Sequence, residues 1–125
     1  MRAELQNAFR RYARLRAWGR DLSSVPLRLL HRPDRLASTG EASLQGIRIV
    51  AGRCPYDAHA TLLHELAHMA DGPWRRPPHG TRWRERYALA VAEETGFLMA
   101  IDHRAIRRVD DEAVAALRAH LKRRA

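Results

Sequence analysis

The stretch His64-Glu65-Leu66-Ala67-His68 has the form H-E-x-x-H, and the rest of the chain is interpreted around it. Residues four apart on a helix lie on one face, with Cβ atoms roughly 5–6 Å apart. Two imidazoles placed in this way can bind one ion at Zn–N distances of about 2.0–2.1 Å. Glu65 points about 100° away from His64 around the helix, so its carboxylate can reach a metal-bound water without displacing either histidine. The pattern therefore predicts a zinc site in which Glu65 accepts a proton from the attacking water.

The residues around the motif favour a metal over the alternative, a helix with a hydrogen-bonded surface cluster of two histidines and a glutamate. Apolar residues at helical spacing give the segment a buried face: Leu63, Leu66, Ala67 and Ala70. Asp57 is expected to cap the helix, and Asp71-Gly72-Pro73 is expected to end it. These signals predict a helix over residues 58–71, with the motif near its middle, where the backbone is stiff.

A hydrolytic zinc site needs three protein ligands and one open position. The candidate third ligand is His79, in the segment Pro77-Pro78-His79-Gly80-Thr81-Arg82-Trp83. Two prolines restrict the loop before His79, and Gly80 relaxes the backbone after it. The intervening loop is long enough to fold back over the end of the motif helix. We therefore expect His79 to lie beside the two helix histidines.

The sequence HELAH, followed by ten residues and then HGTRW, resembles the core of the SprT-like zinc metalloproteases, which include the Spartan proteins. In that family two helix histidines and the histidine of an H-G-x-x-[WF] segment bind zinc, and the glutamate is the general base. The resemblance implies His64, His68 and His79 as zinc ligands and Glu65 as the catalytic base. It is clearest from about Ile47 to Tyr87. It implies a minimal zincin-like fold, peptide-bond hydrolysis, and a DNA-repair role on proteins crosslinked to DNA.

Other zinc peptidase patterns fit this sequence less well. The metzincin pattern would place a glycine and a histidine where this chain has Asp71 and Trp74. A gluzincin would take a glutamate from the next helix, where Glu85, Glu93 and Glu94 are available; these rank second to His79. Many SprT-like proteins also carry a cysteine-rich zinc ribbon after the protease domain. This sequence has no CxxC pair, so that DNA-contacting module is not expected here.

Length and composition bound the class of protein. With 125 residues, of which 46% are hydrophobic, the chain is expected to form a single domain over residues 1–125. No apolar run approaches the roughly 18 residues that a membrane span needs, and the first residues lack the apolar core of a signal peptide. The single cysteine, Cys54, cannot form an intrachain disulfide, so a cytoplasmic protein without membrane contact is expected. Cys54 is interpreted as a small apolar residue, with an inhibitory ligand or nucleophile as alternatives.

The formal net charge is +9, from 23 Lys and Arg against 14 Asp and Glu. Such an excess favours attraction to phosphate backbones and makes DNA a candidate partner. The alternative is a solvated arginine-rich surface, because the arginines are spread along the chain and no basic run exceeds three residues.

The pattern around the motif predicts an α+β fold: an N-terminal helix, a small, mostly antiparallel sheet, the motif helix and further C-terminal helices. The expected N-terminal helix covers residues 3–20, and the expected strands lie within 25–51, with a middle strand within 36–44. A helix over 80–95 should anchor His79, and Asp110 or Asp111 should cap a last helix.

Several side chains near the motif have two interpretations. Tyr87 is a hydrogen-bond donor to the tetrahedral intermediate or, more simply, a core-edge residue. Asp71 orients a ligand histidine or only caps the helix. Arg82 and Arg84 are candidate contacts for a substrate carboxylate or a phosphate. His31 and His59 are not expected to be ligands.

These observations predict a zinc-dependent metallopeptidase that acts on protein or peptide substrates. An alternative is a basic nucleic-acid-binding protein with a structural zinc, in which Cys54 would supply the fourth ligand. A further alternative is a peptidase dedicated to one regulator protein. Manganese or iron could occupy the same ligands, and zinc is favoured as the commonest ion for this motif.

Overall fold

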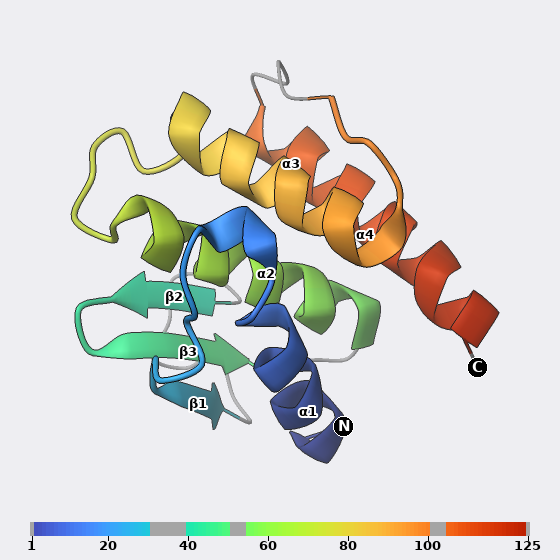
Figure 1. Ribbon diagram of the computed structural model, residues 1–125, viewed down its shortest axis with the longest axis horizontal. Coiled ribbons are helices and arrows are strands. Elements are labelled where there is room, and N and C mark those ends of the chain that lie inside the picture. Colours follow the sequence, from blue (N-terminus) through green and yellow to red (C-terminus); the bar gives the residue numbers. More distant parts are fainter. Residues whose placement is uncertain (1, 31–39, 51–54, 101–104, 125) are drawn as a thin grey trace.

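The computed structural model describes residues 2–30, 40–50, 55–100 and 105–124. Over these residues the chain is an α+β fold with four α-helices and a small mixed sheet of three strands (Figure 1). The elements follow the order α1 (Arg2–Tyr12), η1 (Arg16–Trp18), β1 (Leu27–Leu30), β2 (Gly40–Ser43), β3 (Gly46–Val50), α2 (Pro55–Asp71), α3 (Thr81–Thr95) and α4 (Ile106–Arg124). None of these helices is long and apolar enough to cross a membrane.

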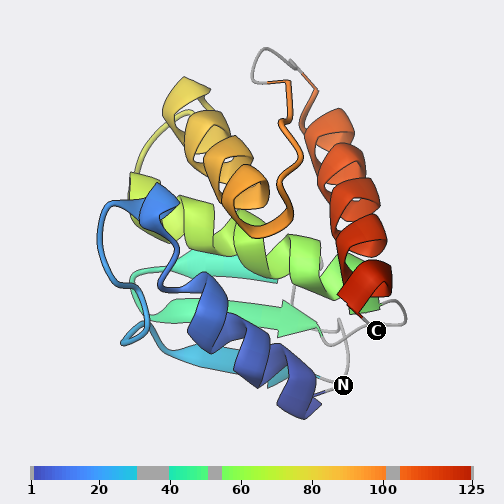
Figure 2. The ribbon, with the colours of Figure 1, turned by 45° about the vertical axis from the view of Figure 1, so that its right-hand side comes forward.

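The motif helix α2 is the centre of the fold. It contacts α1, α3, α4, β2 and β3, and in Figure 2 it crosses the molecule between the sheet and the pair α3 and α4. Its apolar side chains are fully buried at Leu62, Leu63, Leu66 and Ala67. The predicted helix is confirmed, but it begins at Pro55 rather than at 58, because proline is well suited to the first helical position. Asp57 consequently lies within the first turn and is not the cap.

The sheet is mixed, and the prediction of a mostly antiparallel sheet is wrong. Its strand order is β1-β3-β2, with β1 parallel to β3 and β2 antiparallel to β3. The pair β2 and β3 is a hairpin, and β2 lies at an edge. Gly46 begins β3 at a φ of 123°, where a Cβ would lie 2.5 Å from the carbonyl oxygen of Pro26. Of the predicted middle strand, residues 40–43 form β2 at the edge rather than the centre, and residues 36–39 lie outside the described residues.

The predicted N-terminal helix over 3–20 is wrong in its second half, because α1 ends at Tyr12 and the chain turns into η1. The indole Nε1 of Trp18 donates a 2.6 Å hydrogen bond to the carbonyl oxygen of Tyr12. The carboxylate of Glu93 in α3 accepts hydrogen bonds from the backbone N–H groups of Arg16 and Ala17, at 2.8 and 2.9 Å. A distant glutamate thus satisfies the donors of this short turn, which local spacing does not reveal.

The two C-terminal helices close the core. The predicted helix over 80–95 is confirmed as α3, which ends at Gly96 in a left-handed conformation with φ of 80°. The last helix exists, but it begins at Ile106, so the prediction that Asp110 or Asp111 caps it is wrong. Buried residues of α4 join the main cluster at Val109, Ala113, Ala116 and Leu117. His31 and Cys54 lie outside the described residues.

Candidate metal centre

Three histidines converge at one point beside α2. His64 and His68 lie one turn apart on that helix, and His79 reaches them from the loop between α2 and α3. Their Nε2 atoms form a triangle with sides of 3.1, 3.2 and 3.2 Å. Two nitrogens bound to one tetrahedral zinc are about 3.3–3.4 Å apart, given Zn–N distances of about 2.0–2.1 Å. The three nitrogens are therefore placed closely enough to hold one metal ion.

The protonation of these rings suits metal binding. Nδ1 of His64 lies 2.9 Å from Oδ1 of Asp110, so Nδ1 carries the proton and Nε2 presents its lone pair to the triangle. Burial lowers the pKa of His68 to about 3, and the neighbouring His64 and His79 lower it further. Burial likewise lowers the pKa of His79. Neutral imidazoles with converging lone pairs are the donors that zinc prefers among nitrogen ligands.

The ring of Trp83 packs against all three histidine rings. It is fully buried, and its ring centroid lies 4.7 Å from His64, 5.2 Å from His68 and 4.7 Å from His79. The ring of His68 is stacked on it at 24°. The indole Nε1 donates a 3.2 Å hydrogen bond to the backbone carbonyl of His64. One tryptophan on α3 therefore restrains all three rings and the backbone of the motif helix.

Glu65 is buried next to the triangle, with 5% of its surface exposed. Burial raises the pKa of its carboxyl group to about 7. Strand β2 approaches it so closely that a Cβ on Gly40 would lie 2.9 Å from Oε2 of Glu65 and 2.5 Å from Cγ2 of Thr61. A glycine is needed at this crossing of strand and helix, and its lack of a side chain leaves room for the carboxylate.

A cleft of about 430 Å³ opens over these groups. Its base contains the three histidines and Glu65, and Gly40 and Ala42 of the edge strand β2 form one side. Pro73, Arg76 and Pro78 of the loop after α2 also line it. The cleft thus places three histidines that are close enough to hold a metal ion, together with a buried carboxylate, beside the edge of a sheet.

The alternative glutamate ligands are engaged elsewhere. Glu93 binds the backbone of η1, as described above, and Glu85 is exposed on α3. Glu94 pairs with Arg11 at 3.0 Å and with Arg124 at 3.7 Å. Among the described residues, the group of ligand atoms close enough to share a metal ion consists of the three histidines.

The remaining candidates near the motif have structural contacts. Asp71 lies 3.8 Å from Arg75 and 3.7 Å from Arg82. The carboxylate that contacts a histidine of the triangle is that of Asp110. The Tyr87 hydroxyl is buried, and its one proton lies between two acceptors, the carbonyl oxygen of Ala60 at 3.0 Å and Oδ1 of Asp110 at 3.2 Å, as expected for a core residue.

His59 is buried away from the triad. It bonds the hydroxyl of Tyr12 at 2.8 Å and the carboxylate of Glu4 at 3.0 Å. This histidine is therefore a core residue with both ring nitrogens hydrogen-bonded, and it is not one of the three histidines of the triangle.

Sequence reasoning missed the role of Asp110. It lies 46 residues beyond His64, in a helix outside the segment that resembles the SprT-like core, and beside Asp111 it has the local pattern of a helix cap. No local spacing in the sequence connects it to the motif.

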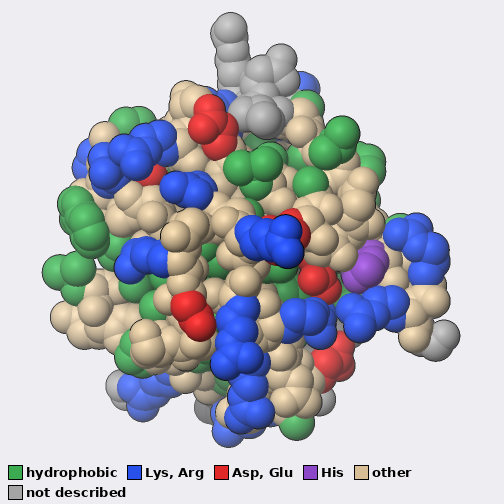
Figure 3. All heavy atoms as spheres, viewed as in Figure 1, with side chains coloured by type: hydrophobic (Ala, Val, Ile, Leu, Met, Phe, Trp, Pro, Cys, Tyr) green, Lys and Arg blue, Asp and Glu red, His purple; other side chains and the backbone are tan. Residues whose placement is uncertain are grey.

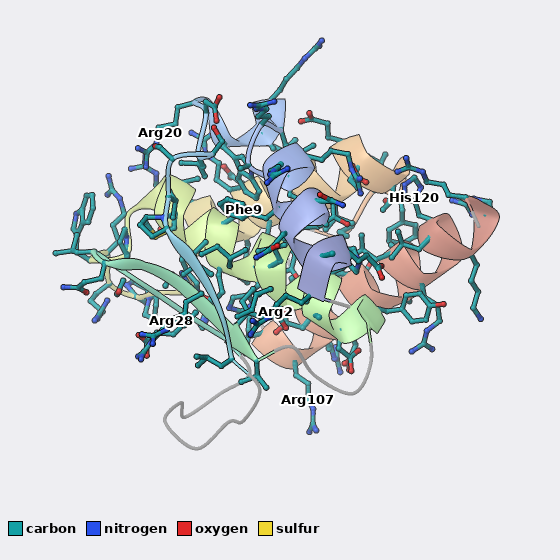
Figure 4. All side chains as sticks on the ribbon, turned by 90° about the horizontal axis from the view of Figure 1, so that it is seen from below. Arg2, Phe9, Arg20, Arg28, Arg107 and His120 are labelled. Carbon is teal, nitrogen blue, oxygen red and sulfur yellow. The ribbon has the colours of Figure 1, made fainter. Side chains whose placement is uncertain are left out.

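The basic side chains are distributed over the surface. Figure 3 shows Lys and Arg at separate places on one face, among apolar and acidic side chains. Arg28 of β1 and Arg107 of α4 project outward at different positions in Figure 4. On the face drawn in Figure 3 the basic side chains therefore lie at several places rather than in one patch.

Comparison of the chain with protein-family models, with curated proteins and with solved structures gave no match.

Proposed function

We propose that the protein is a zinc-dependent metallopeptidase of the SprT-like type. The observation that carries the proposal is the triangle of Nε2 atoms from His64, His68 and His79, with the buried carboxylate of Glu65 beside it in an open cleft. Zinc held by these ligands supplies a water whose pKa is lowered toward about 7 and polarises the carbonyl to be attacked.

The protein's own residues have distinct tasks in this proposal. The three imidazoles would hold the ion as its protein ligands. Glu65 accepts the proton of the attacking water and transfers it to the leaving amine. Burial raises the pKa of Glu65 to about 7 in the metal-free protein, and the charge of a bound zinc ion would lower it, which favours the carboxylate form that accepts a proton. Trp83 keeps the rings in place through stacking and its hydrogen bond to His64.

The resemblance supports the same assignment. HELAH lies within α2, and the histidine and tryptophan of HGTRW meet it from the loop and from α3. Both segments of the resemblance therefore contribute to one cleft.

We propose that the substrate is an extended polypeptide lying along β2. An edge strand can bind an extended peptide through its backbone, as an added strand. Ala42 places the edge of β2 in the wall of the cleft that contains Glu65. The net charge of +9 supports DNA-associated or DNA-crosslinked proteins as the targets, because it favours binding near phosphate backbones.

The structural-zinc alternative is less well supported. Structural zinc sites are usually closed by four protein ligands. The described residues bring three histidines together, and Cys54 lies outside those residues. Zinc-edge X-ray absorption of the loaded protein separates the two: a sulfur ligand at about 2.3 Å would favour the structural site, and a shell of nitrogen and oxygen ligands alone would favour the enzyme.

The test of the function is cleavage of a basic DNA-binding protein by the zinc-loaded chain, with and without single-stranded DNA. Glu65→Gln should abolish cleavage while one zinc stays bound per chain. Glu85→Gln is the matched control. Because Glu85 is exposed on α3, this variant should cleave the substrate at the rate of the unchanged protein. Cleavage by Glu65→Gln at the normal rate, or a chain that binds no zinc, would refute the proposal.

The DNA arm of the same experiment addresses the substrate class. Cleavage that depends on both Glu65 and DNA supports DNA-associated proteins as targets. Cleavage that depends on Glu65 but not on DNA supports the proposed peptidase activity and contradicts DNA-associated proteins as its targets. Trp74 gives an independent measure of DNA binding because it is 66% exposed while Trp18 and Trp83 are buried. Quenching of tryptophan emission by oligonucleotide should therefore report on Trp74 and disappear in Trp74→Phe.

A further inference from the structure

A carboxylate of the last helix contacts one histidine of the proposed metal centre and a neighbouring tyrosine. Oδ1 of Asp110 in α4 lies 2.9 Å from Nδ1 of His64 in α2 and 3.2 Å from the hydroxyl of Tyr87 in α3. The side chain of His64 is 14% exposed and that of Asp110 is 37% exposed. Three helices therefore meet at one partly shielded carboxylate, on the side of His64 that faces away from the triangle.

This contact decides which nitrogen of His64 is available. A neutral imidazole carries one proton, and only the nitrogen without it can bind a metal. An acceptor at Nδ1 holds the proton there and leaves the lone pair on Nε2, the atom that lies 3.2 Å from the Nε2 atoms of both His68 and His79. With the proton on Nε2 instead, an N–H bond would point into the triangle and oppose binding. The negative charge of Asp110 also makes Nε2 of His64 a stronger electron-pair donor to a metal ion.

His64 differs from the other two histidines in this respect. Among the described residues, no Asp or Glu lies within ion-pair distance of His68 or His79. The Tyr87 hydroxyl lies 3.2 Å from the same oxygen of Asp110 and so helps to hold that carboxylate in place. Asp110 is therefore the one described carboxylate that orients a ring of the triad.

We propose that Asp110 is a positioning residue that fixes the tautomer and angle of His64, so that α4 completes the metal centre. The inference rests on the proposed zinc site and adds a helix that lies outside the segment resembling the SprT-like core. Burial of Val109, Ala113 and Leu117 docks α4 against the rest of the fold and so holds Asp110 in place. Metal affinity thereby depends on the docking of α4.

The experiment measures zinc affinity by competition with a chromogenic chelator. Asp110→Ala should weaken zinc binding by about 10–100-fold, the usual effect of losing a residue that supports a metal ligand. Asp110→Asn keeps the shape and one acceptor oxygen, so it should weaken binding less. Asp111→Asn is the matched control, because Asp111 is the exposed neighbour on the same helix and should bind zinc like the unchanged protein.

A second readout isolates the tautomer from any general structural damage. In the metal-free protein, long-range ¹H–¹⁵N spectra should show His64 as the Nδ1–H tautomer, and Asp110→Ala should shift it toward a mixture. Asp110→Asn should remain folded by circular dichroism, so the test stands even if the alanine variant does not fold.

The outcomes separate this inference from the proposed function. Two results would overturn the role of Asp110 and leave the proposed peptidase intact. The first is a zinc affinity in both Asp110 variants equal to that of Asp111→Asn. The second is an unchanged His64 tautomer in Asp110→Ala or, if that variant does not fold, in Asp110→Asn. If the unchanged chain binds no zinc, the proposed function fails, and the metal-free spectra still decide whether Asp110 fixes His64.

Discussion

Replacement of Gly40 by alanine tests the packing of β2 against the motif helix. The added methyl group would lie 2.5 Å from Cγ2 of Thr61 and 2.9 Å from Oε2 of Glu65, where ordinary contacts begin near 3.4 Å. Relief requires a shift of roughly 0.5–1 Å between strand and helix, and overpacking of this kind costs about 1–3 kcal/mol of stability. A misplacement of about 1 Å at a catalytic group can lower activity by about 100-fold.

Two further variants separate the contact with Thr61 from the contact with Glu65 and provide a control for stability. The double variant Gly40→Ala with Thr61→Ser removes the 2.5 Å contact and keeps the one to Glu65, so it should recover stability but only part of the activity. Gly80→Ala is the control for stability, because its φ is −74° and its added methyl would meet no atom closer than 3.5 Å. Thermal unfolding and peptide cleavage measure both effects. Normal stability and normal cleavage in Gly40→Ala would refute the reasoning.

Three further outcomes are expected. Trp83→Ala should lower the free energy of unfolding by about 3–5 kcal/mol and should also weaken zinc binding. Trp83→Phe should lower the free energy of unfolding by only about 1 kcal/mol. Denaturant titration measures the free energy of unfolding of both variants. Removal of zinc by a chelator should lower the unfolding temperature, since a ligand at about 1,000 times its Kd adds about 4 kcal/mol of stability; an unchanged temperature would show that these histidines hold no ion. Glu93→Ala should cost about 1–2 kcal/mol by leaving the N–H groups of Arg16 and Ala17 without their acceptor, and wild-type stability would contradict that contact.

The sequence predicts what local geometry determines. The four-residue spacing of His64 and His68 fixes their relation on any helix, and α2 and α3 follow from apolar periodicity with clear stop signals. His79 was found through a short motif whose loop folds back onto that helix. The convergence of the three histidine rings can therefore be predicted from the spacing of residues within the two motifs.

Contacts between distant segments explain what the sequence did not predict. Alternating apolar residues identify β1 and β3 as strands but do not say that they run parallel, because direction depends on the path of the chain between them. The break after Tyr12 depends on Glu93, more than 70 residues away. The link between His64 and Asp110 likewise joins helices that no local pattern relates.

The contacts of Trp83 with the three histidines would give the proposed metal centre an optical signal of its own. An indole ring within about 5 Å of three ligand rings should lose its emission when an open-shell ion such as Co²⁺ replaces closed-shell zinc. In a Trp74→Phe background the exposed indole no longer contributes to that signal. Metal exchange could then be followed in real time in the absence of any substrate, so occupancy of the centre becomes observable before its target is known.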